Sequence, residues 1–132
     1  MSEADSLLTG HEHILYVDDE YELTDIGEQM LRHLGYKITT MTSSVEALEL
    51  FRTLPQKFDL VISDMTMPKM TGLELAGKLL QIRPDIPIIL CTGFNEHLSE
   101  DAVKESGIRK VIMKPMVMQT LSKTIRKILD DQ

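Results

Sequence analysis

The sequence predicts a single α/β domain, with a doubly wound parallel sheet of five strands and helices on both of its faces. Three observations lead to this prediction. The chain has 132 residues, the usual length of one domain. Five short apolar segments alternate along it with five segments of helical pattern. The composition, 42% hydrophobic and 27% charged residues, is that of an ordinary globular protein.

The five apolar segments are predicted to be strands. The first, third and fourth are nearly continuous in apolar residues, as expected of strands that are buried on both faces. The second alternates more between apolar and polar residues, which favours an edge strand. The strands are expected at His13–Val17, Lys37–Met41, Leu60–Ser63, Ile86–Cys91 and Arg109–Met113.

The segments between the strands carry helix signals. Gly35 ends the first apolar helical face, and Ser43 or Ser44 caps the second helix. Thr71 and Glu74 form a capping box at the start of the third. In chain order, the helices are expected at Leu23–Leu34, Val45–Leu54, Gly72–Ile82, between a cap at Asn95 and a stop at Gly107, and from Leu121 to about Asp130.

Charge and cysteine content argue against several classes of function. The 14 basic residues are outnumbered by 21 acidic ones, a net charge of −7, which argues against direct binding to nucleic acid or to an anionic membrane. The longest apolar run is too short to cross a bilayer, and the first ten residues lack a secretory pattern. A single cysteine, Cys91, excludes an internal disulfide. We therefore expect a cytoplasmic domain at residues 11–132, preceded by a tail or the end of a linker at residues 1–10.

Polar side chains follow four of the predicted strands at the point where each strand ends. Asp18 and Asp19 follow the first strand, Asp64 the third, Thr92 the fourth and Lys114 the fifth. The carboxyl ends of parallel strands meet at one edge of a sheet, and open α/β sheets bind their ligands there. We therefore expect these five side chains to lie close together.

Each of these residues also has an ordinary structural explanation, because an acid often caps a helix and a lysine is often a solvated surface charge. A cap explains one acid well and three poorly. Three neighbouring carboxylates would repel one another unless a cation lay among them, and oxygen ligands with open water positions suit Mg²⁺. The sequence therefore predicts a magnesium site at Asp18, Asp19 and Asp64. Pro115 restricts Lys114 to an extended backbone, and the sequence leaves the isomer of this bond open.

Taken in order, these motifs resemble the receiver domain of two-component response regulators of the chemotaxis-regulator type, over about His13 to Asp130. The acidic pair lies in the segment ILYVDDE, and Asp64 begins the phosphoacceptor motif DMTMPKMTG, which ends at Gly72. Thr92 matches the switch hydroxyl of the family, and Lys114 with the following Pro115 matches its Lys-Pro pair. The resemblance implies a flavodoxin-like fold, with strand order 2-1-3-4-5 and five flanking helices.

The resemblance also implies a reaction. Asp64 would take a phosphoryl group from a phosphohistidine of a histidine kinase or a histidine phosphotransfer protein. Mg²⁺, or Mn²⁺ in its place, would be held by the three acids and the backbone carbonyl of Thr66, with Asp18 acting mainly through water. Lys114 would pair with one phosphoryl oxygen, and Thr92 would donate its hydroxyl to another. That movement would switch a surface that binds a downstream effector protein or domain. The domain alone is not expected to be a conventional enzyme.

Two positions depart from the family pattern. Val111 stands where many receivers carry an aromatic residue that turns with the switch hydroxyl. Phe94 stands where polar residues are common, and we expect it to shield the acyl phosphate from water and to slow its hydrolysis. Val111 and Phe94, together with Pro115 after the lysine, are expected to modulate the reaction.

The segments GHEHILYVDDE and LCTGFNE resemble receivers joined to hybrid sensor kinases. This resemblance implies a phosphorelay partner or a longer parent chain, such as a hybrid histidine kinase, with a free single-domain regulator as the alternative. A receiver-like protein-interaction module that acts without phosphorylation remains the rival function. Its usual sign is loss of the acids or the lysine, and none is lost here. The domain is expected to be a monomer or a weak dimer.

Overall fold

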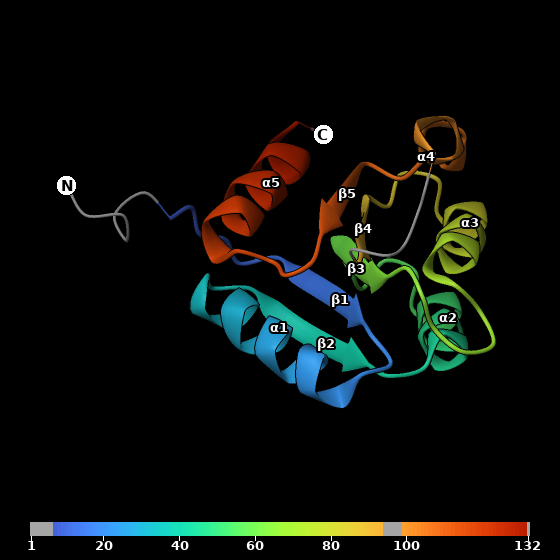
Figure 1. Cartoon of the computed structure of the whole chain (residues 1–132), viewed down its shortest axis with the longest axis horizontal. Coiled ribbons are helices and arrows are strands. Elements are labelled where there is room, and N and C mark those ends of the chain that lie inside the picture. The colour runs from blue at the N-terminus through green and yellow to red at the C-terminus, as the bar shows by residue number, and fades with distance from the viewer. Residues whose placement is uncertain (1–6, 94–98, 132) are drawn as a thin grey trace.

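The structure is a computed structural model that describes residues 7–93 and 99–131. Five strands and five helices alternate along the chain (Figure 1). The strands are β1 (His13–Val17), β2 (Lys37–Met41), β3 (Leu60–Asp64), β4 (Ile88–Thr92) and β5 (Lys110–Met113). The helices are α1 (Tyr21–His33), α2 (Ser44–Thr53), α3 (Gly72–Ile82), α4 (Glu100–Ser106) and α5 (Met118–Asp130).

All five strands are parallel and lie in the order β2-β1-β3-β4-β5, which confirms the predicted fold class. The chain runs from β1 to β2 on one side and then crosses back to β3 on the other side of β1. The strand order therefore reverses between β1 and β3, and in open α/β sheets ligands bind outside the carboxyl ends of the strands at this point. The predicted edge position of β2 is also confirmed.

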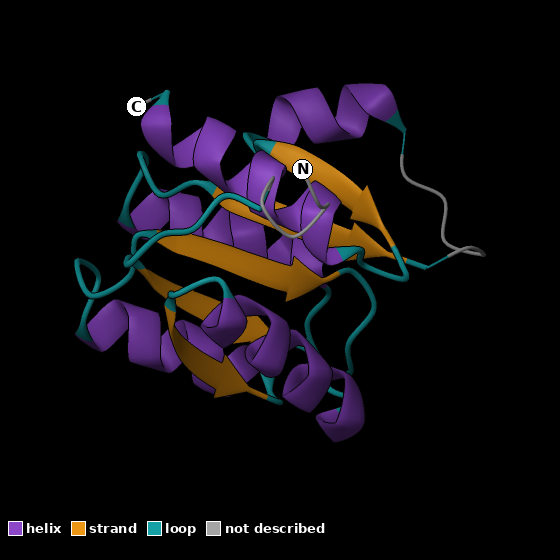
Figure 2. Cartoon of the chain, turned by 90° about the vertical axis from the view of Figure 1, so that its left-hand side faces the viewer, coloured by secondary structure: helices purple, strands orange, loops and turns teal. Residues whose placement is uncertain are grey.

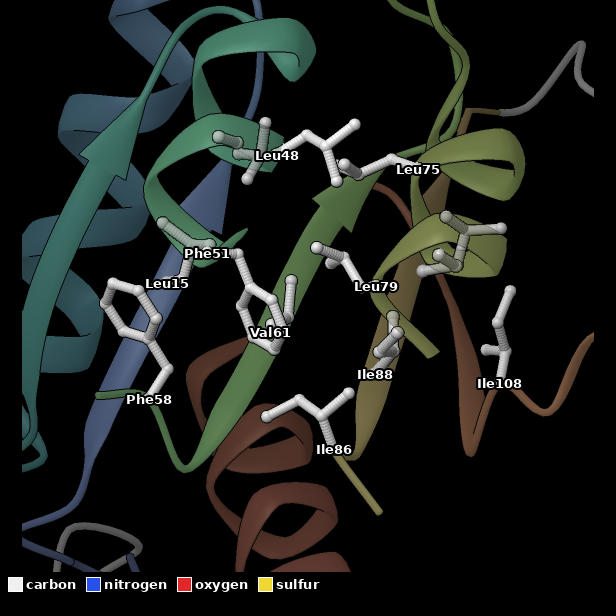
Figure 3. Close-up of a cluster of buried hydrophobic side chains, with 14 of the residues drawn as sticks. Leu15, Leu48, Phe51, Phe58, Val61, Leu75, Leu79, Ile86, Ile88 and Ile108 are labelled. Carbon is white, nitrogen blue, oxygen red and sulfur yellow. The ribbon is translucent and has the colours of Figure 1, made fainter. Parts of the chain in front are cut away.

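The sheet separates two hydrophobic clusters, because successive residues of a strand point to opposite faces. On β1, Leu15 and Val17 belong to a cluster with α2 and α3, whereas Ile14 and Tyr16 belong to a cluster with α1 and α5. Figure 1 shows α1 and α5 on one side of the sheet and α2, α3 and α4 on the other, and Figure 2 shows the sheet between these two layers. In Figure 3, side chains from α2 and α3 meet those of β1, β3 and β4 in the first cluster.

Several predicted boundaries and one helix face differ from the structure. The strand β4 begins at Ile88, just after a proline that has no N–H to pair, and β3 extends through Asp64. The cap of α4 is Ser99, whose hydroxyl accepts the N–H of Ala102, and not Asn95, which lies outside the described residues. In α1, Ile26 is 55% exposed although the apolar pattern placed it on the buried face.

The segment before β1 is tied to α5 and to the end of α1. The guanidinium of Arg126 donates to both carboxylate oxygens of Glu12, at 2.8 and 3.0 Å, and also to Asp130 at 2.6 Å. The backbone N–H of Gly10 donates to the carbonyl of Leu34 at 3.0 Å. These bonds lie at the amino ends of the strands, away from the edge where the acidic residues were expected. Within residues 7–93 and 99–131, no helix has the length and apolar character needed to span a bilayer.

Candidate phosphoacceptor and metal site

The structure brings the polar residues of the strand ends together at the carboxyl edge of the sheet. Asp18 directly follows β1, Asp64 ends β3, Thr92 ends β4 and Lys114 directly follows β5. The strands β3 and β4 are in register with Asp64 opposite Cys91, so Asp64 and Thr92 lie on neighbouring strands one position apart. The sheet itself therefore fixes the spacing of these residues.

The three acids form one cluster. One carboxylate oxygen from each of Asp18, Asp19 and Asp64 lies within 4.8 Å of the other two. Asp18 is 1% exposed and Asp64 5% exposed, whereas Asp19 is open to solvent. Two buried carboxylates beside a solvent-facing one form an all-oxygen donor set with open positions, which fits a hard cation such as Mg²⁺.

A second contact of Asp18 orders the turn that leads into α1. One of its carboxylate oxygens accepts the backbone N–H of Glu20 at 3.0 Å, and its own backbone N–H donates to the carbonyl of Met41 at 3.1 Å. Asp18 therefore orders the turn before α1 but does not cap the helix, the ordinary explanation for one acid of the pair, because the N-cap residue is Glu20 and no side chain caps α1. The other carboxylate oxygen of Asp18 lies 3.3 Å from the ammonium nitrogen of Lys114.

Lys114 is the cation that partners this cluster. Its Nζ lies 2.8 Å from Oδ1 of Asp64 and 3.3 Å from Oδ2 of Asp18. Burial alone would lower the pKa of Lys114, but the two carboxylates outweigh burial and raise its pKa above the ordinary value. Lys114 therefore carries its charge at neutral pH. Its backbone N–H donates to the carbonyl of Thr92 at 2.8 Å, and the bond to Pro115 is cis.

The loop between β3 and α3 closes on itself beside Asp64. The N–H of Met65 donates to the carbonyl of Cys91 at 2.8 Å, and the N–H of Gly72 donates to the carbonyl of Met65 at 2.7 Å. Lys69 adopts a left-handed backbone with φ of 70°. The capping box of Thr71 and Glu74 is present, as predicted. Thr66 lies in this loop and is exposed.

Thr92 and the strand β5 form the other side of the site. Thr92 is 5% exposed, and its hydroxyl donates to the thioether sulfur of Met113 at 3.9 Å. Val111 is half-buried and packs against the cluster that contains α2 and α3. Phe94 lies outside the described residues. The contact of Met113 had no signal in the sequence, since it depends on the register between β4 and β5.

An apolar pocket adjoins the acidic cluster, and the sequence pattern does not predict it. Its volume is about 400 Å³, and its lining includes Tyr16, Ile26, Met116 and the site residues Asp18 and Lys114. The pocket lies between α1 and the segment that joins β5 to α5. Gly27 lines it as well, and a Cβ at this position would come 2.7 Å from the ring of Tyr16.

Comparison with sequence families and curated proteins points to one group. The sequence model of the response regulator receiver domain matches residues 14–126. The chain is 31% identical to the sensor kinase CckA of Brucella abortus over 95% of its length, and 35% identical to the two-component response regulator ARR12 of Arabidopsis thaliana over 82%. It spans 13% of the first relative and 18% of the second, so both are much longer proteins.

Solved structures give the same picture. A response regulator receiver domain protein from Clostridium thermocellum superimposes with a TM-score of 0.86 at 28% identity, over 91% of this chain and 95% of that one. The response regulator TrrA of Thermotoga maritima, solved in complex with Mg²⁺ and BeF, has a TM-score of 0.80 at 31% identity. That alignment covers 89% of this chain and 99% of TrrA.

Proposed function

Since the chain belongs to the response regulator receiver domain family of two-component signalling, we propose that Asp64 accepts a phosphoryl group from a phosphohistidine in a Mg²⁺-dependent reaction. The observation that carries the proposal is the cluster of Asp18, Asp19 and Asp64 beside the ammonium of Lys114. Three carboxylates and one ammonium group, from the carboxyl ends of three strands, form a site that can hold a metal cation and an anionic group together.

The proposed reaction moves one phosphoryl group between two proteins. A carboxylate oxygen of Asp64 forms a bond to phosphorus while the bond from phosphorus to the histidine nitrogen breaks, and the histidine leaves. Bound Mg²⁺, held by Asp18, Asp19, Asp64 and the backbone carbonyl of Thr66, or Mn²⁺ in its place, would offset the negative charges that meet in this step.

The protein's own side chains would then stabilise the product. Lys114, already charged and 2.8 Å from Asp64, is placed to pair with one oxygen of the new phosphoryl group. Thr92, on the neighbouring strand, would donate its hydroxyl to another. These contacts exist only after phosphorylation, so they shift the domain towards a second conformation that an effector protein or domain can bind.

The phosphohistidine must reach Asp64 from a partner, a histidine kinase or a histidine phosphotransfer protein. The apolar pocket between α1 and the β5–α5 segment supports an approach from this side, because it opens beside Lys114 and is flanked by the exposed Ile26 and Pro115. A partner protein can bury apolar surface against this pocket while its phosphohistidine is aligned with Asp64. A cytoplasmic location for the domain is part of this proposal.

Three further residues are proposed to modulate the reaction. Val111 replaces the aromatic half of the switch with a half-buried aliphatic side chain. Pro115 lines the pocket next to Lys114. Phe94 is proposed to shield the acyl phosphate from water. A longer parent chain, including a hybrid histidine kinase, is consistent with the similarity to a sensor kinase of which this chain covers 13%.

A mass measurement tests the phosphoacceptor assignment. The folded protein is incubated with Mg²⁺ and acetyl phosphate, and its intact mass is recorded. We expect a covalent phosphoryl adduct that chelation of Mg²⁺ abolishes and that Asp64→Asn lacks. The control variant is Asp85→Asn, which changes an exposed carboxylate near the amino end of β4 and should keep the adduct. If folded parent protein forms no adduct at saturating donor, the proposal is wrong and the interaction module without phosphorylation takes its place.

A further inference from the structure

The hydroxyl of Thr92 already has a partner before any phosphoryl group is present. It is buried at the end of β4 and donates to Sδ of Met113 at 3.9 Å. The thioether of methionine is a weak hydrogen-bond acceptor. The contact is therefore one that a stronger acceptor can replace.

The register of the sheet produces this contact. Thr92 and Met113 are direct partners across β4 and β5, and the N–H of the next residue, Lys114, donates to the carbonyl of Thr92. Side chains of directly paired residues lie on the same side of a sheet and close together. Met113 is thus the strand partner of the residue proposed to switch, and it directly precedes the residue proposed to bind phosphate.

Met113 is largely exposed although its strand partner Thr92 is buried. It is 59% exposed, so little of its side chain fills the core. Val111, two residues earlier on the same face of β5, is half-buried and has no polar side-chain atom. The sulfur of Met113 is consequently the acceptor that β5 offers to the Thr92 hydroxyl.

We propose that Met113 is a positioning residue for the switch: its thioether holds the Thr92 hydroxyl in the unphosphorylated domain and competes for it with the phosphoryl oxygen. This inference rests on the proposed function, because it requires the Thr92 hydroxyl to serve the phosphoryl group. An anionic phosphoryl oxygen is a stronger acceptor than the thioether, so after phosphorylation the Thr92 hydroxyl donates to the phosphoryl oxygen. Loss of the sulfur leaves the hydroxyl without that partner in the resting state and makes the exchange more favourable.

A double-mutant cycle tests this competition. Beryllofluoride with Mg²⁺ serves as the phosphoryl mimic, and its Kd is measured by calorimetry for the parent, Met113→Leu, Thr92→Val and the double variant. We expect Met113→Leu to tighten binding about threefold in the parent background, the size of one modest hydrogen bond. In the Thr92→Val background the same substitution is expected to have no effect. Met118→Leu, a half-buried methionine on α5, is the matched control and should leave the Kd unchanged.

A second measurement avoids the need for a folded Thr92→Val variant. In protein labelled with ¹³C at the methionine methyl groups, the Met113 signal is expected to move when beryllofluoride is added. An unmoved Met113 signal, or an equal effect of Met113→Leu in both backgrounds, overturns the role of Met113 while the proposed function stands. A folded parent that binds no beryllofluoride in the presence of Mg²⁺ overturns the proposed function and this inference with it.

Discussion

At the level of single residues, the site holds more negative charge than its lysine can balance. Asp18 and Asp64 are buried and share the ammonium of Lys114, while Asp19 adds a third carboxylate from the solvent side. Buried like charges destabilise a folded protein unless a cation pairs with them. Repulsion among these carboxylates is therefore expected to lower the free energy of unfolding of the metal-free domain.

Removal of one of these charges should stabilise the metal-free protein and abolish its response to metal. We expect Asp19→Asn to raise the unfolding temperature in chelator, because Asp19 is exposed and its loss relieves repulsion without a change in packing. In the parent, Mg²⁺ at ten times its Kd should stabilise the fold by about 1.4 kcal/mol, and most of this gain should be lost in the variant.

Thermal unfolding in chelator and over a Mg²⁺ titration measures both effects. Asp85→Asn, far from the cluster, is the control that keeps the response to Mg²⁺. A parent protein whose unfolding temperature does not change with Mg²⁺ would contradict a metal site at the three acids.

The sequence was sufficient to place the five polar site residues, and the reason is topological. Asp64, Thr92 and Lys114 each lie at the carboxyl end of a parallel strand. Parallel strands bring their carboxyl ends to one edge of the sheet, and this does not depend on how the side chains pack. The contact of Met113 and the pocket at Tyr16 were not predictable in this way. They depend on the register of one strand pair and on how tightly α1 approaches the sheet.

At the level of elements, α3 and the loop before it contain two glycines with opposite requirements. At Gly72 an added Cβ would clash with the backbone oxygen of Asp64 and would lie 2.7 Å from a methyl carbon of Leu90. At Gly77, inside α3, an added Cβ would meet nothing within 4 Å. The first glycine allows the backbone to pass close to Asp64, whereas the second only loosens the helix.

These two glycines make a matched pair of predictions. Gly72→Ala is expected to destabilise the fold by about 2–3 kcal/mol and to reduce adduct formation at Asp64, because backbone must move to admit the methyl group. Gly77→Ala is expected to stabilise it by about 0.5–1 kcal/mol, since alanine is the better helix former. Urea unfolding measures both values. Equal effects of the two substitutions would show that the close approach at Gly72 is not a constraint.

Helix existence was predictable at this scale, but helix ends and faces were less so. Asn95 and Ser99 are both good capping residues, and the sequence alone does not say which one the chain uses before a short helix with no buried side chain. Ile26 fits an apolar face by spacing alone. The structure instead turns α1 so that Gly27 packs on Tyr16, which leaves Ile26 at the pocket. Tertiary packing decided both cases.

At the level of the whole molecule, one ion pair joins residues that are 114 positions apart in the chain. Arg126 on α5 holds Glu12 with two hydrogen bonds, which brings the segment before β1 against the last helix. The hydrogen bonds from the guanidinium lower the pKa of Glu12 to about 2, although burial of the carboxylate acts in the opposite direction. A bidentate pair that is mostly shielded from solvent contributes more than an ordinary surface pair.

This pair gives the stability of the domain a defined dependence on pH. Because the folded pKa of Glu12 is lowered, its contribution is complete above the unfolded value of 4.5 and disappears as the pH falls from there towards 2. We expect Glu12→Gln to cost on the order of 1–3 kcal/mol at pH 7 and progressively less below pH 4.5. Urea unfolding of parent and variant from pH 7 to pH 3 measures the difference.

The control for this experiment is Glu49→Gln, which removes an exposed pair with Arg52 on α2. Such a pair should contribute less than about 0.5 kcal/mol at any pH. If the cost of Glu12→Gln stays constant from pH 7 to pH 3, the bidentate pair is not what ties the first segment to α5.

The closed loop between β3 and α3 has a consequence for how this domain can diversify. The hydrogen bonds of Met65 and Gly72 tie both ends of the loop, so an inserted or deleted residue would break the closure and displace Asp64. The outward side chains of Thr66 and Lys69 take no part in it. Evolution, or a protein engineer, can therefore change the exposed side chain of Thr66 at constant loop length without moving the carboxylate of Asp64, whereas the left-handed backbone of Lys69 restricts the residues that fit there.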